Sequence, residues 1–386
     1  MKSVSRNFQL GIDTLLGEHA GWVRGARVGL VAHAASVDAT GVPTAERLHA
    51  AGVQLAALFG PEHGFASRAG AGEEVGDARH PAWHIPVHSL YGATRQPTPE
   101  MLAGLDVLLF DLQDIGVRCY TYGATLRHVL EAAAEQHKAV IVLDRPIPLA
   151  GVVDGPRPEE KFMGFVAALP APFCYGLAPG ATALWLRDKL RLHLNLRVAP
   201  ARGTPPAGRW IPPSPALRSA AGARAYPATV LFEAFPAWDV GRPTAMAFQE
   251  IRRQATGHGL QTKPADWENI CELARGHLFA AAGLETRDSV RLEVLPDGLR
   301  LTVTGLAAYR PALTGVALVH AIQQVWGAKS LWEEEGARPE WFDQLMGTDR
   351  VRLALQSDAT PAAVAAAWAP DLAAFRAESS RRHTAE

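Results

Sequence analysis

Four short apolar runs, separated by segments with a helical pattern, organise the first half of the chain. The runs cover positions 27–33, 54–59, 105–110 and 139–143. Between them, residues 44–51 and about 125–137 have the apolar spacing of amphipathic helices. Alternation of buried strands with helices predicts an α/β domain built on a parallel sheet of βα units.

Each of these runs leads directly into a polar loop. In an open parallel sheet, ligands bind beyond the carboxyl ends of the strands, so these loops are where a site is expected. Neither GxGxxG nor GxxxxGK[ST] accompanies the strands. Because those glycine patterns cradle phosphates, neither dinucleotide binding nor a phosphate-binding P-loop is predicted.

The second half of the chain has a different pattern. Residues 200–227 are rich in Pro, Gly and Ala, which predicts an extended crossing segment. Residues 290–304 alternate apolar and polar positions around Pro-Asp-Gly, as in a β-hairpin, and residues 313–326 and 361–376 have helical spacing. We therefore expect a smaller α+β domain at the C-terminus. The predicted domains are residues 1–235, which carry most of the site, and residues 236–386, which close it.

Composition and charge narrow the function further. Lys and Arg number 38 against 39 Asp and Glu, so the formal net charge is −1. No basic excess is present to displace counterions from phosphates, which argues against nucleic-acid binding. The three cysteines are far apart and predict buried thiols rather than disulfides or a zinc site. No signal-peptide core and no run of about 18 apolar residues is present, which predicts a cytoplasmic protein without a membrane span.

The loop Gly60-Pro61-Glu62-His63-Gly64-Phe65 is the sharpest candidate for chemistry. A carboxylate at the end of a strand, held between Pro and Gly, is well placed to act as a general acid. Glu62 could equally cap the following segment or pair with Arg68. The loop at 72–77 adds three more acids, among them Glu73, and is more typical of a solvated surface. The 14 histidines include neither HExxH nor HxH, so no metal site is predicted.

The segment at 111–122, DLQDIGVRCYTY, places two acids, an amide, an arginine and two tyrosines after one strand. Planar hydrogen-bonding groups and tyrosine rings suit a sugar or an acid-bearing ligand. Arg118 can form a bidentate pair with a carboxylate, either of a ligand or of Asp114. For Arg118 alone, the internal pair is the favoured interpretation.

Together these segments resemble one protein family. The blocks FGPEHGF, GEEVGD, IPVHSLYG, DVLLFDLQDIGVRCYTY, VLDRPIPLAG, DGPRPEEKFMGFV, YPATVLFEA and WFDQLMGTDRVRLAL occur in its order and spacing. The sequence resembles the exo-β-N-acetylmuramidases of the NamZ/YbbC type, formerly a domain of unknown function, over essentially the whole chain. The resemblance implies a glycoside hydrolase that removes terminal N-acetylmuramic acid from muropeptides or disaccharides in cell-wall recycling. It also implies a Rossmann-like domain without a dinucleotide, a smaller C-terminal domain, a cleft between them as the active site, and no cofactor.

The resemblance assigns roles to individual positions. Glu62 becomes the leading catalytic acid, with His63 beside it. The residues implied to line the same pocket are His33, Asp111, Gln113, Asp114, Arg118, Tyr120, Tyr122, Asp144 and Arg145. Glycosidases generally use two carboxyl groups, and the second is left open here among Asp111, Asp114, Glu73 and Glu159, or the sugar's own acetamido group. Arg118 or Arg242 would bind the lactyl carboxylate of muramic acid.

Four positions in the matching blocks depart from the family pattern by replacing a polar or charged residue. They are Ile147, Tyr175, Ala181 and Ala216. These replacements favour an alternative interpretation, a protein that binds an amino sugar or muropeptide without turning it over. The intact blocks around Glu62 and at 111–122 favour an enzyme.

Overall fold

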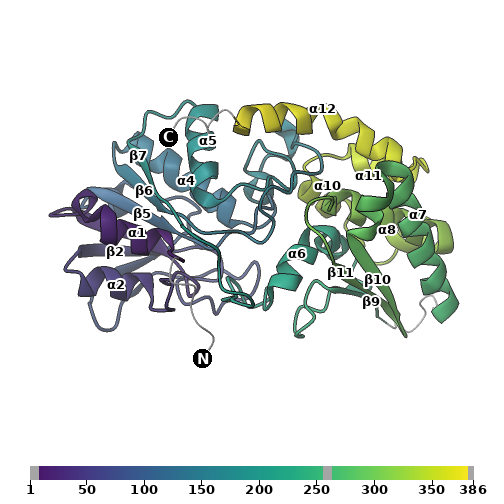
Figure 1. The fold of residues 1–386 in the computed structure, drawn as a ribbon, viewed down its shortest axis with the longest axis horizontal. Helices are drawn as coiled ribbons and strands as arrows, with labels where there is room; N and C mark the ends of the chain where they lie inside the picture. Colours follow the sequence, from purple (N-terminus) through teal and green to yellow (C-terminus); the bar gives the residue numbers. More distant parts are fainter. Residues whose placement is uncertain (1–7, 255–262, 381–386) are drawn as a thin grey trace. The chain divides into compact units, whose positions relative to one another are not determined.

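The computed structural model describes residues 8–254 and 263–380, which form two compact units (Figure 1). The first unit contains Met1–Ile115, Tyr120–Ala150 and Leu177–Pro215, and the second contains Gly116–Cys119, Gly151–Gly176 and Ala216–Glu386. The chain therefore passes between the units several times. The single boundary predicted after residue 235 does not describe these compact units.

The first unit is built on a seven-stranded sheet in the order β3-β4-β2-β1-β5-β6-β7. Its strands are β1 (Arg27–Ala32), β2 (Gln54–Gly60), β3 (Ala78–Arg79), β4 (Pro86–Ser89), β5 (Val107–Asp111), β6 (Ala139–Leu143) and β7 (Leu196–Ala199). All neighbours pair in parallel except the two-residue edge strand β3, which pairs antiparallel with β4. The predicted parallel α/β sheet is confirmed, and all four predicted apolar runs are strands.

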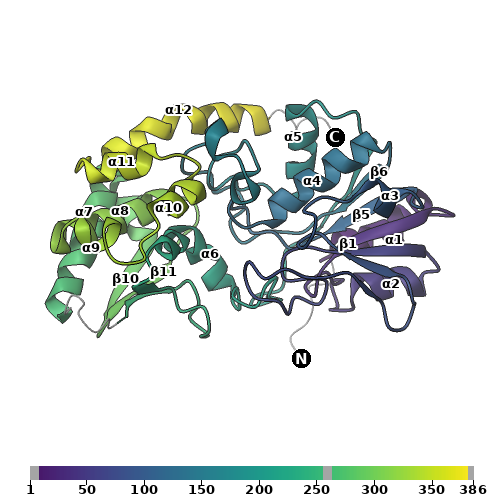
Figure 2. The ribbon, with the colours of Figure 1, turned by 180° about the vertical axis from the view of Figure 1, so that it is seen from behind.

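Helices cover both faces of this sheet. Helices α1 (Gly11–Glu18) and α2 (Thr44–Ala50) share one hydrophobic core with alternate strand residues such as Leu30 and Leu109. Helices α4 (Tyr122–Glu135) and α5 (Pro179–Lys189) pack on the other face (Figure 2). A single short turn, α3 (Pro99–Leu102), precedes β5.

The second unit contains a small antiparallel sheet in the order β10-β11-β9-β8. Its strands are β8 (Trp238–Asp239), β9 (Glu250–Arg253), β10 (Val290–Leu295) and β11 (Gly298–Val303). The predicted hairpin is β10 and β11, whose six residues each pair one to one. The predicted α+β character of this part of the chain is thereby confirmed.

Helices surround a buried central helix in this unit. The helices are α6 (Ala220–Thr229), α7 (Pro264–Asp288), α8 (Pro311–Trp326), α9 (Lys329–Trp332), α10 (Pro339–Met346), α11 (Arg350–Gln356) and α12 (Pro361–Ser380). Helix α8 is buried at every position from Pro311 to Gln323, which is why its sequence is apolar on all sides. Helix α7 bends at Gly283, where the backbone leaves the helical region. Cys119, Cys174 and Cys271 are free and buried, as predicted.

The predicted extended crossing segment at 200–227 is wrong in its last part, because α6 begins at Ala220. The Ser219 hydroxyl accepts a hydrogen bond from the Gly222 N–H and so caps the helix. The alanine-rich run that follows has a high helix propensity. Pro227 lies near the C-terminal end of α6, where the loss of one N–H interrupts little of the hydrogen-bond ladder.

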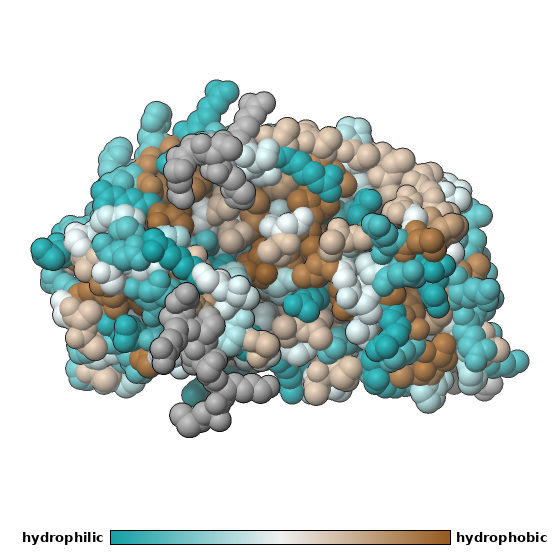
Figure 3. Space-filling model, viewed as in Figure 1, coloured by the Kyte–Doolittle hydropathy of each residue, from teal (hydrophilic) through white to brown (hydrophobic). Residues whose placement is uncertain are grey.

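The surface carries few large exposed apolar side chains. Among the described residues these are Val42, Met163, Phe279, Leu284, Val294 and Leu353. On the face drawn in Figure 3, patches of apolar residues lie among hydrophilic ones. None of the helices within residues 8–254 and 263–380 has the length and apolar character needed to cross a bilayer.

Candidate active site

The carboxyl ends of the central strands of the first unit lie side by side. The register pairs Ala32 of β1 with Asp111 of β5, and Val31 of β1 with Phe59 of β2. The order β2-β1-β5 also makes this edge a topological switch point, because the chain moves outward from β1 in both directions. The loops after β1, β2 and β5 therefore meet, as the sequence predicted.

The loop after β2 makes a sharp turn that depends on small residues. A Cβ on Gly60 would lie 2.4 Å from the backbone nitrogen of Phe65, so only glycine fits there. His63 and Gly64 both have positive φ, at 71° and 76°. Such a conformation is strained for His63, which is held by a 2.9 Å contact between its Nδ1 and the carbonyl oxygen of Ala69.

This turn presents Glu62, whose side chain is 8% exposed. Its Oε1 accepts a hydrogen bond from the Gly72 N–H at 2.9 Å, and its Oε2 accepts one from the Thr121 hydroxyl at 2.6 Å. Thr121 directly precedes α4, so Glu62 lies beside the N-terminus of that helix. Burial and the charge of Glu62 raise the pKa of Tyr91, so this phenol also lies beside the carboxylate. Glu62 is thus fixed at both of its oxygens.

Two buried tyrosines are subject to the charges of both Glu62 and a second carboxylate, Asp114. The rings of Tyr120 and Tyr122 contact edge to face with centroids 4.8 Å apart. Burial raises the pKa of both phenols far above the usual value, and the charges of Glu62 and Asp114 raise it further. Both carboxylates therefore lie close to the tyrosine pair. Asp114 is itself buried, and its Oδ1 accepts a 2.7 Å hydrogen bond from the Ile115 N–H.

His33 was predicted to bind substrate, but both of its ring nitrogens are used within the protein. Its Nδ1 lies 3.1 Å from the carbonyl oxygen of Pro213, and its Nε2 accepts a 3.0 Å hydrogen bond from the Gln113 N–H. Burial, and then the charge of Arg145, lower the pKa of His33 to about 3. The imidazole is therefore neutral, with the proton on Nδ1. His33 ties the loops after β1 and β5 together, and its contact with a ligand stays a prediction.

Asp111 and Arg145 form a buried ion pair, which removes both from the predicted set of ligand-facing residues. The Arg145 Nη2 donates to Asp111 Oδ2 at 3.0 Å, its Nε donates to the other oxygen, and Nη2 also bonds the carbonyl oxygen of Val37 at 2.7 Å. The Thr44 hydroxyl donates to the same carboxylate. Asp111 is fully buried and Arg145 is 3% exposed. A carboxylate so completely bonded is structural, so Asp111 does not fit a catalytic role.

Gln113 and Asp144 also have local partners. The Gln113 side-chain amide donates to the carbonyl oxygen of Pro146 at 3.0 Å. Asp144 Oδ1 accepts a hydrogen bond from the Gly180 N–H at 2.9 Å in the first turn of α5. Burial raises the pKa of Asp144, while that hydrogen bond and Arg145 oppose the shift. Asp144 therefore serves as a cap for α5.

Arg118 belongs to the second unit and is fully buried. Its guanidinium donates to four carbonyl oxygens, those of Pro156, Ala171, Leu345 and Met346, at 2.6–3.2 Å. Burial lowers its pKa to about 10, so it stays charged at neutral pH. Asp114 is not bonded to it, so the predicted internal pair is wrong. Arg118 holds four carbonyl groups of the second unit, which is a structural role, and a contact with a ligand carboxylate stays a prediction.

Glu159 lies in the second unit and lines a cavity of about 450 Å³. Its carboxylate accepts a hydrogen bond from the Thr348 hydroxyl and forms an ion pair with Arg350 at 3.1 Å. Trp368 and Asp371 from α12 line the same cavity. Glu159 can therefore face a ligand within this unit.

The remaining predicted residues lie at the surface. Arg242 is 43% exposed and forms an ion pair with Glu233, both in the second unit. Glu73, in the first unit, accepts a 2.7 Å hydrogen bond from the Gly70 N–H. That bond shapes the 70–73 turn, whose Gly72 N–H reaches Glu62. Glu73 is thus connected to Glu62 through the backbone of this turn.

The four positions that depart from the family pattern differ in burial. Ile147 is 7% exposed and Tyr175 is 1% exposed, so both side chains fill the protein interior. Ala181 lies in the first turn of α5, and Ala216 is half-buried.

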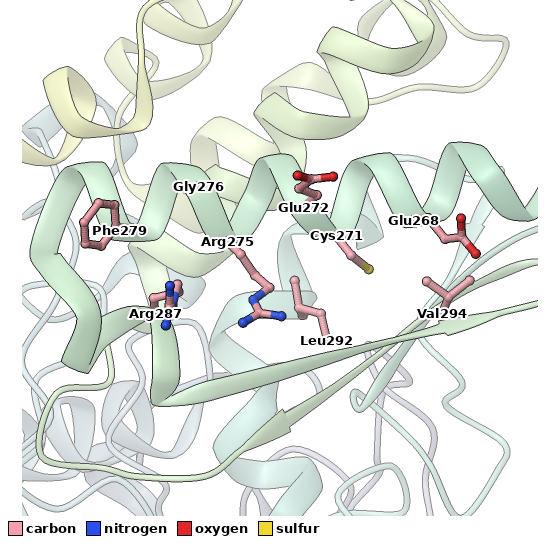
Figure 4. Close-up of a pocket in the computed structure, with 9 residues that line it drawn as sticks. All are labelled: Glu268, Cys271, Glu272, Arg275, Gly276, Phe279, Arg287, Leu292 and Val294. Atoms are coloured by element: carbon pink, nitrogen blue, oxygen red, sulfur yellow. The ribbon is translucent and has the colours of Figure 1, made fainter.

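A second cavity of the second unit lies between α7 and β10 and has a volume of about 600 Å³. Cys271 and Arg275 extend from α7 toward Leu292 and Val294 of β10 (Figure 4). It contains none of the predicted site residues. Its lining mixes acids, arginines and apolar groups, with no carboxylate held as Glu62 is.

The sequence analysis missed residues that hold Glu62. Thr121 lies in the 111–122 block and Tyr91 in the block IPVHSLYG, but neither block marks these residues as partners of Glu62. Gly72 acts only through its backbone N–H, which has no sequence signature. The positions of Thr121 and Tyr91 inside those blocks were the available clues.

Comparisons with known proteins agree with this architecture. Residues 28–221 match the model of the N-terminal domain of the exo-β-N-acetylmuramidase NamZ, and residues 224–384 match that of its C-terminal domain. The peptidoglycan β-N-acetylmuramidase NamZ of Bacillus subtilis is 31% identical over 364 residues, covering 90% of this chain and 84% of that protein.

Two solved structures of DUF1343 family proteins from Bacteroides fragilis are similar over almost their whole length. One has 27% identity and a TM-score of 0.84, with 98% of this chain and 99% of that chain covered. The other has 22% identity and a TM-score of 0.70, covering 97% and 98%, and supports the fold alone. On the family-model matches and the similarity to the Bacillus protein, this chain belongs to the NamZ family of exo-β-N-acetylmuramidases.

Proposed function

We propose that this protein is a glycoside hydrolase that removes terminal β-N-acetylmuramic acid from peptidoglycan fragments, with Glu62 as its general acid. Family membership over nearly the full chain supports the reaction and the substrate. The position of Glu62 supports its role. Both of its oxygens accept hydrogen bonds, and its charge, like that of Asp114, acts on Tyr120 and Tyr122.

The contacts of Glu62 determine which of its oxygens can carry the proton. A backbone N–H can only donate, so Oε1, which bonds Gly72, stays an acceptor. A hydroxyl can donate or accept, so Thr121 is compatible with both the ionised and the protonated forms of Glu62 at Oε2. The acid therefore keeps one geometry through proton donation to the glycosidic oxygen. Such preorganisation is what general acid catalysis requires.

Asp114 is the best candidate for the second group. Asp111 is committed to Arg145, and Glu159 is bonded to Thr348 and Arg350. Asp114 acts on the same pair of tyrosines as Glu62 and follows β5, at the same edge of the sheet as the loop after β2 that carries Glu62. We assign it to activating water or to orienting the sugar's acetamido group. The neutral tyrosines beside it supply hydroxyl groups for sugar recognition.

The test is hydrolysis of a chromogenic β-N-acetylmuramide by the wild-type protein and by the Glu62→Gln variant. General acid catalysis contributes roughly 10²–10⁴-fold, so the variant should lose at least about a hundredfold in kcat. The matched control is Glu131→Gln, which should keep full activity. It alters only the ion pair that Glu131 forms with Arg127, one turn away on α4. Equal rates for wild type and Glu62→Gln would remove Glu62 from catalysis. Calorimetric binding of N-acetylmuramic acid without any hydrolysis by the wild type would instead favour the binding protein.

A further inference from the structure

Strand β10 lies at an open edge of the small sheet in the second unit. In the part of the chain that the structure describes, the sheet order is β10-β11-β9-β8, so β10 has a neighbouring strand on one side only. It has six residues, whereas the other edge strands, β3, β7 and β8, have two to four. Within residues 8–254 and 263–380, β11 alone forms backbone hydrogen bonds with β10. The outer row of N–H and C=O groups of β10 can therefore pair with another strand.

The hydrogen bonds of β11 show which groups of β10 point outward. Leu301 of β11 donates its N–H to the carbonyl oxygen of Gln249, on the side away from β10. Leu301 therefore forms no backbone hydrogen bond with Leu292, which lies opposite it on β10. The N–H and C=O of Leu292 point to the open edge. Because these directions alternate along a strand, those of Val290 and Val294 point there as well.

The sequence of β10 does not protect this edge from pairing. Natural edge strands usually carry a lysine, a proline or a bulge, and β10 has none of these. It carries two charges, Arg291 and Glu293, whose side chains are 63% and 40% exposed. Glu293 lies 3.2 Å from Arg291 and 3.7 Å from Arg300, but ion pairs at the surface add little stability. Both charges are therefore free to contact a second strand.

The charges of this edge are complementary to themselves. We consider a second copy that pairs antiparallel, with Leu292 opposite its own counterpart, so that all three outward-facing residues form hydrogen-bonded pairs. In this register Val290 lies opposite Val294 of the second copy, and Arg291 lies opposite its Glu293. A two-fold axis repeats both contacts. Opposite charges placed directly across two strands stabilise the pairing.

Helix α7 has the same complementarity. Its charged side chains line the cavity between α7 and β10 (Figure 4). Glu268 and Glu272 lie toward the end of the cavity at Val294, and Arg275 and Arg287 lie toward the other end. A second copy that runs antiparallel therefore places the acidic half of one α7 across from the basic half of the other.

Exposed apolar side chains lie at the same edge. Phe279 and Val294 line the cavity and are 51% and 37% exposed, and Leu284 of α7 is 53% exposed. Phe279 lies at the Arg287 end of the cavity, and Val294 lies at the opposite end (Figure 4). In the antiparallel arrangement, Phe279 of each copy is on the same side of the interface as Val294 of the other. Apolar surface at this edge can therefore be buried when two copies meet.

From the open edge, its register and its charges we propose that β10 binds a second copy of this chain. The two β10 strands join the small sheets of both copies into one eight-stranded sheet around a two-fold axis. Backbone pairing alone would accept any extended strand. The charged and apolar patterns are matched by this chain's own sequence in the opposite direction, which identifies the partner as a second copy. The proposal is independent of the proposed catalytic role of Glu62, which lies in the first unit.

Sedimentation equilibrium of the full-length protein over a range of concentrations measures the dimerisation. Arg291→Glu places like charges opposite each other on both sides of the axis and should weaken the dimer about tenfold or more. Adding Glu293→Arg exchanges the two charges, restores their complementarity, and should return the dissociation constant to within a few-fold of the wild-type value. The control is Arg24→Glu, which makes the same change of charge at an exposed position of the first unit and should dimerise as the wild type does.

A second variant tests the backbone pairing directly. Leu292→Pro removes an N–H that points to the open edge and no hydrogen bond to β11, and proline is tolerated at such edge positions. This variant should be monomeric, and circular dichroism and thermal unfolding show whether it is folded. A wild type that is monomeric throughout would leave the edge to a different partner and overturn the proposal. A dimer that is equally strong in wild type, Arg291→Glu and folded Leu292→Pro would overturn it as well, and so would a failure of Glu293→Arg to rescue Arg291→Glu.

Discussion

The replacement of Arg118 by methionine tests whether this residue is structural or binds a ligand. Methionine keeps much of the side-chain volume but removes every N–H donor. The carbonyl oxygens of Leu345 and Met346 belong to the last turn of α10 and have no partner within that helix. Two further carbonyls, of Pro156 and Ala171, lose the same donor. Arg118→Met therefore leaves four acceptors without their bonds in a buried place.

The expected cost follows from two opposing effects. Each orphaned buried acceptor costs about 1–3 kcal/mol. Relief from burying a charge offsets part of this sum, so the net loss should be near the 3–5 kcal/mol typical of a broken buried charge interaction. For a unit of this size each kcal/mol lowers Tm by roughly 2–4 °C, which predicts a fall on the order of 10 °C. Arg118→Lys keeps the charge but cannot span four acceptors with one ammonium, so an intermediate loss is expected.

Urea and thermal unfolding followed by tryptophan fluorescence measure this effect. Trp238, Trp267 and Trp326 contact one another edge to face or at a tilt in the second unit, so their fluorescence reports on its packing. Hydrolysis by Arg118→Met should be close to normal well below its Tm, with an unchanged KM. The structural interpretation is refuted if Tm shifts by less than about 2 °C while KM rises a hundredfold. That result would indicate that Arg118 binds the ligand.

Three other changes test the strand-end loops. Thr121→Val removes the 2.6 Å hydrogen bond to Glu62 and should lower kcat about tenfold or more. Thr121→Ser keeps the hydroxyl and should restore kcat. The pH–rate profiles of both variants distinguish a loss of positioning of Glu62 from misfolding. His33 has a folded pKa of about 3 against 6.5 when unfolded, so the unfolded chain binds an extra proton between these values. Stability should therefore fall by up to about 4 kcal/mol as the pH drops from 6.5 to 3, and urea midpoints of His33→Asn should show a weaker pH dependence. Asp111→Asn should lower the free energy of unfolding by about 3–5 kcal/mol, because it leaves Arg145 unpaired. Adding Arg145→Met should recover part of this loss in a double-mutant cycle. Equal stability of the single and double variants would contradict the ion-pair interpretation.

The central strands were predictable because burial on both faces gives continuous apolar runs. Strands β1, β2, β5 and β6 lie within two residues of their predicted bounds. The edge strand β3 has only two residues and both are exposed, so it lacks that pattern. Helix α6 was not predicted because it contains a proline and a glycine, which disfavour helices. Its formation depends on the Ser219 cap and on burial against the rest of its unit.

The candidate site was predictable in position but less so in the role of each residue. Glu62 was found because glycine and proline mark the turn that presents it. His33, Arg145 and Arg118 have the same chemistry whether they face a ligand or the protein interior. Their partners lie far along the chain, 227 and 228 positions away for the α10 carbonyls that Arg118 bonds. Only the folded structure identifies those partners.

The presence of the block at 111–122 does not by itself establish that the protein is catalytic. Residues 116–119 of the block belong to the second unit, while its two ends belong to the first. Arg118 supports α10, and Asp111 neutralises Arg145. Loss of either would destabilise its unit whether or not the protein turns over a sugar, so these two residues are needed for stability in any case. The residues of the block with a proposed function are Thr121, which bonds Glu62, and Asp114, Tyr120 and Tyr122, since the charges of Asp114 and Glu62 act on both phenols. If substitutions at these four positions alter the rate of hydrolysis without altering the free energy of unfolding, these residues act in catalysis rather than in stabilising the fold.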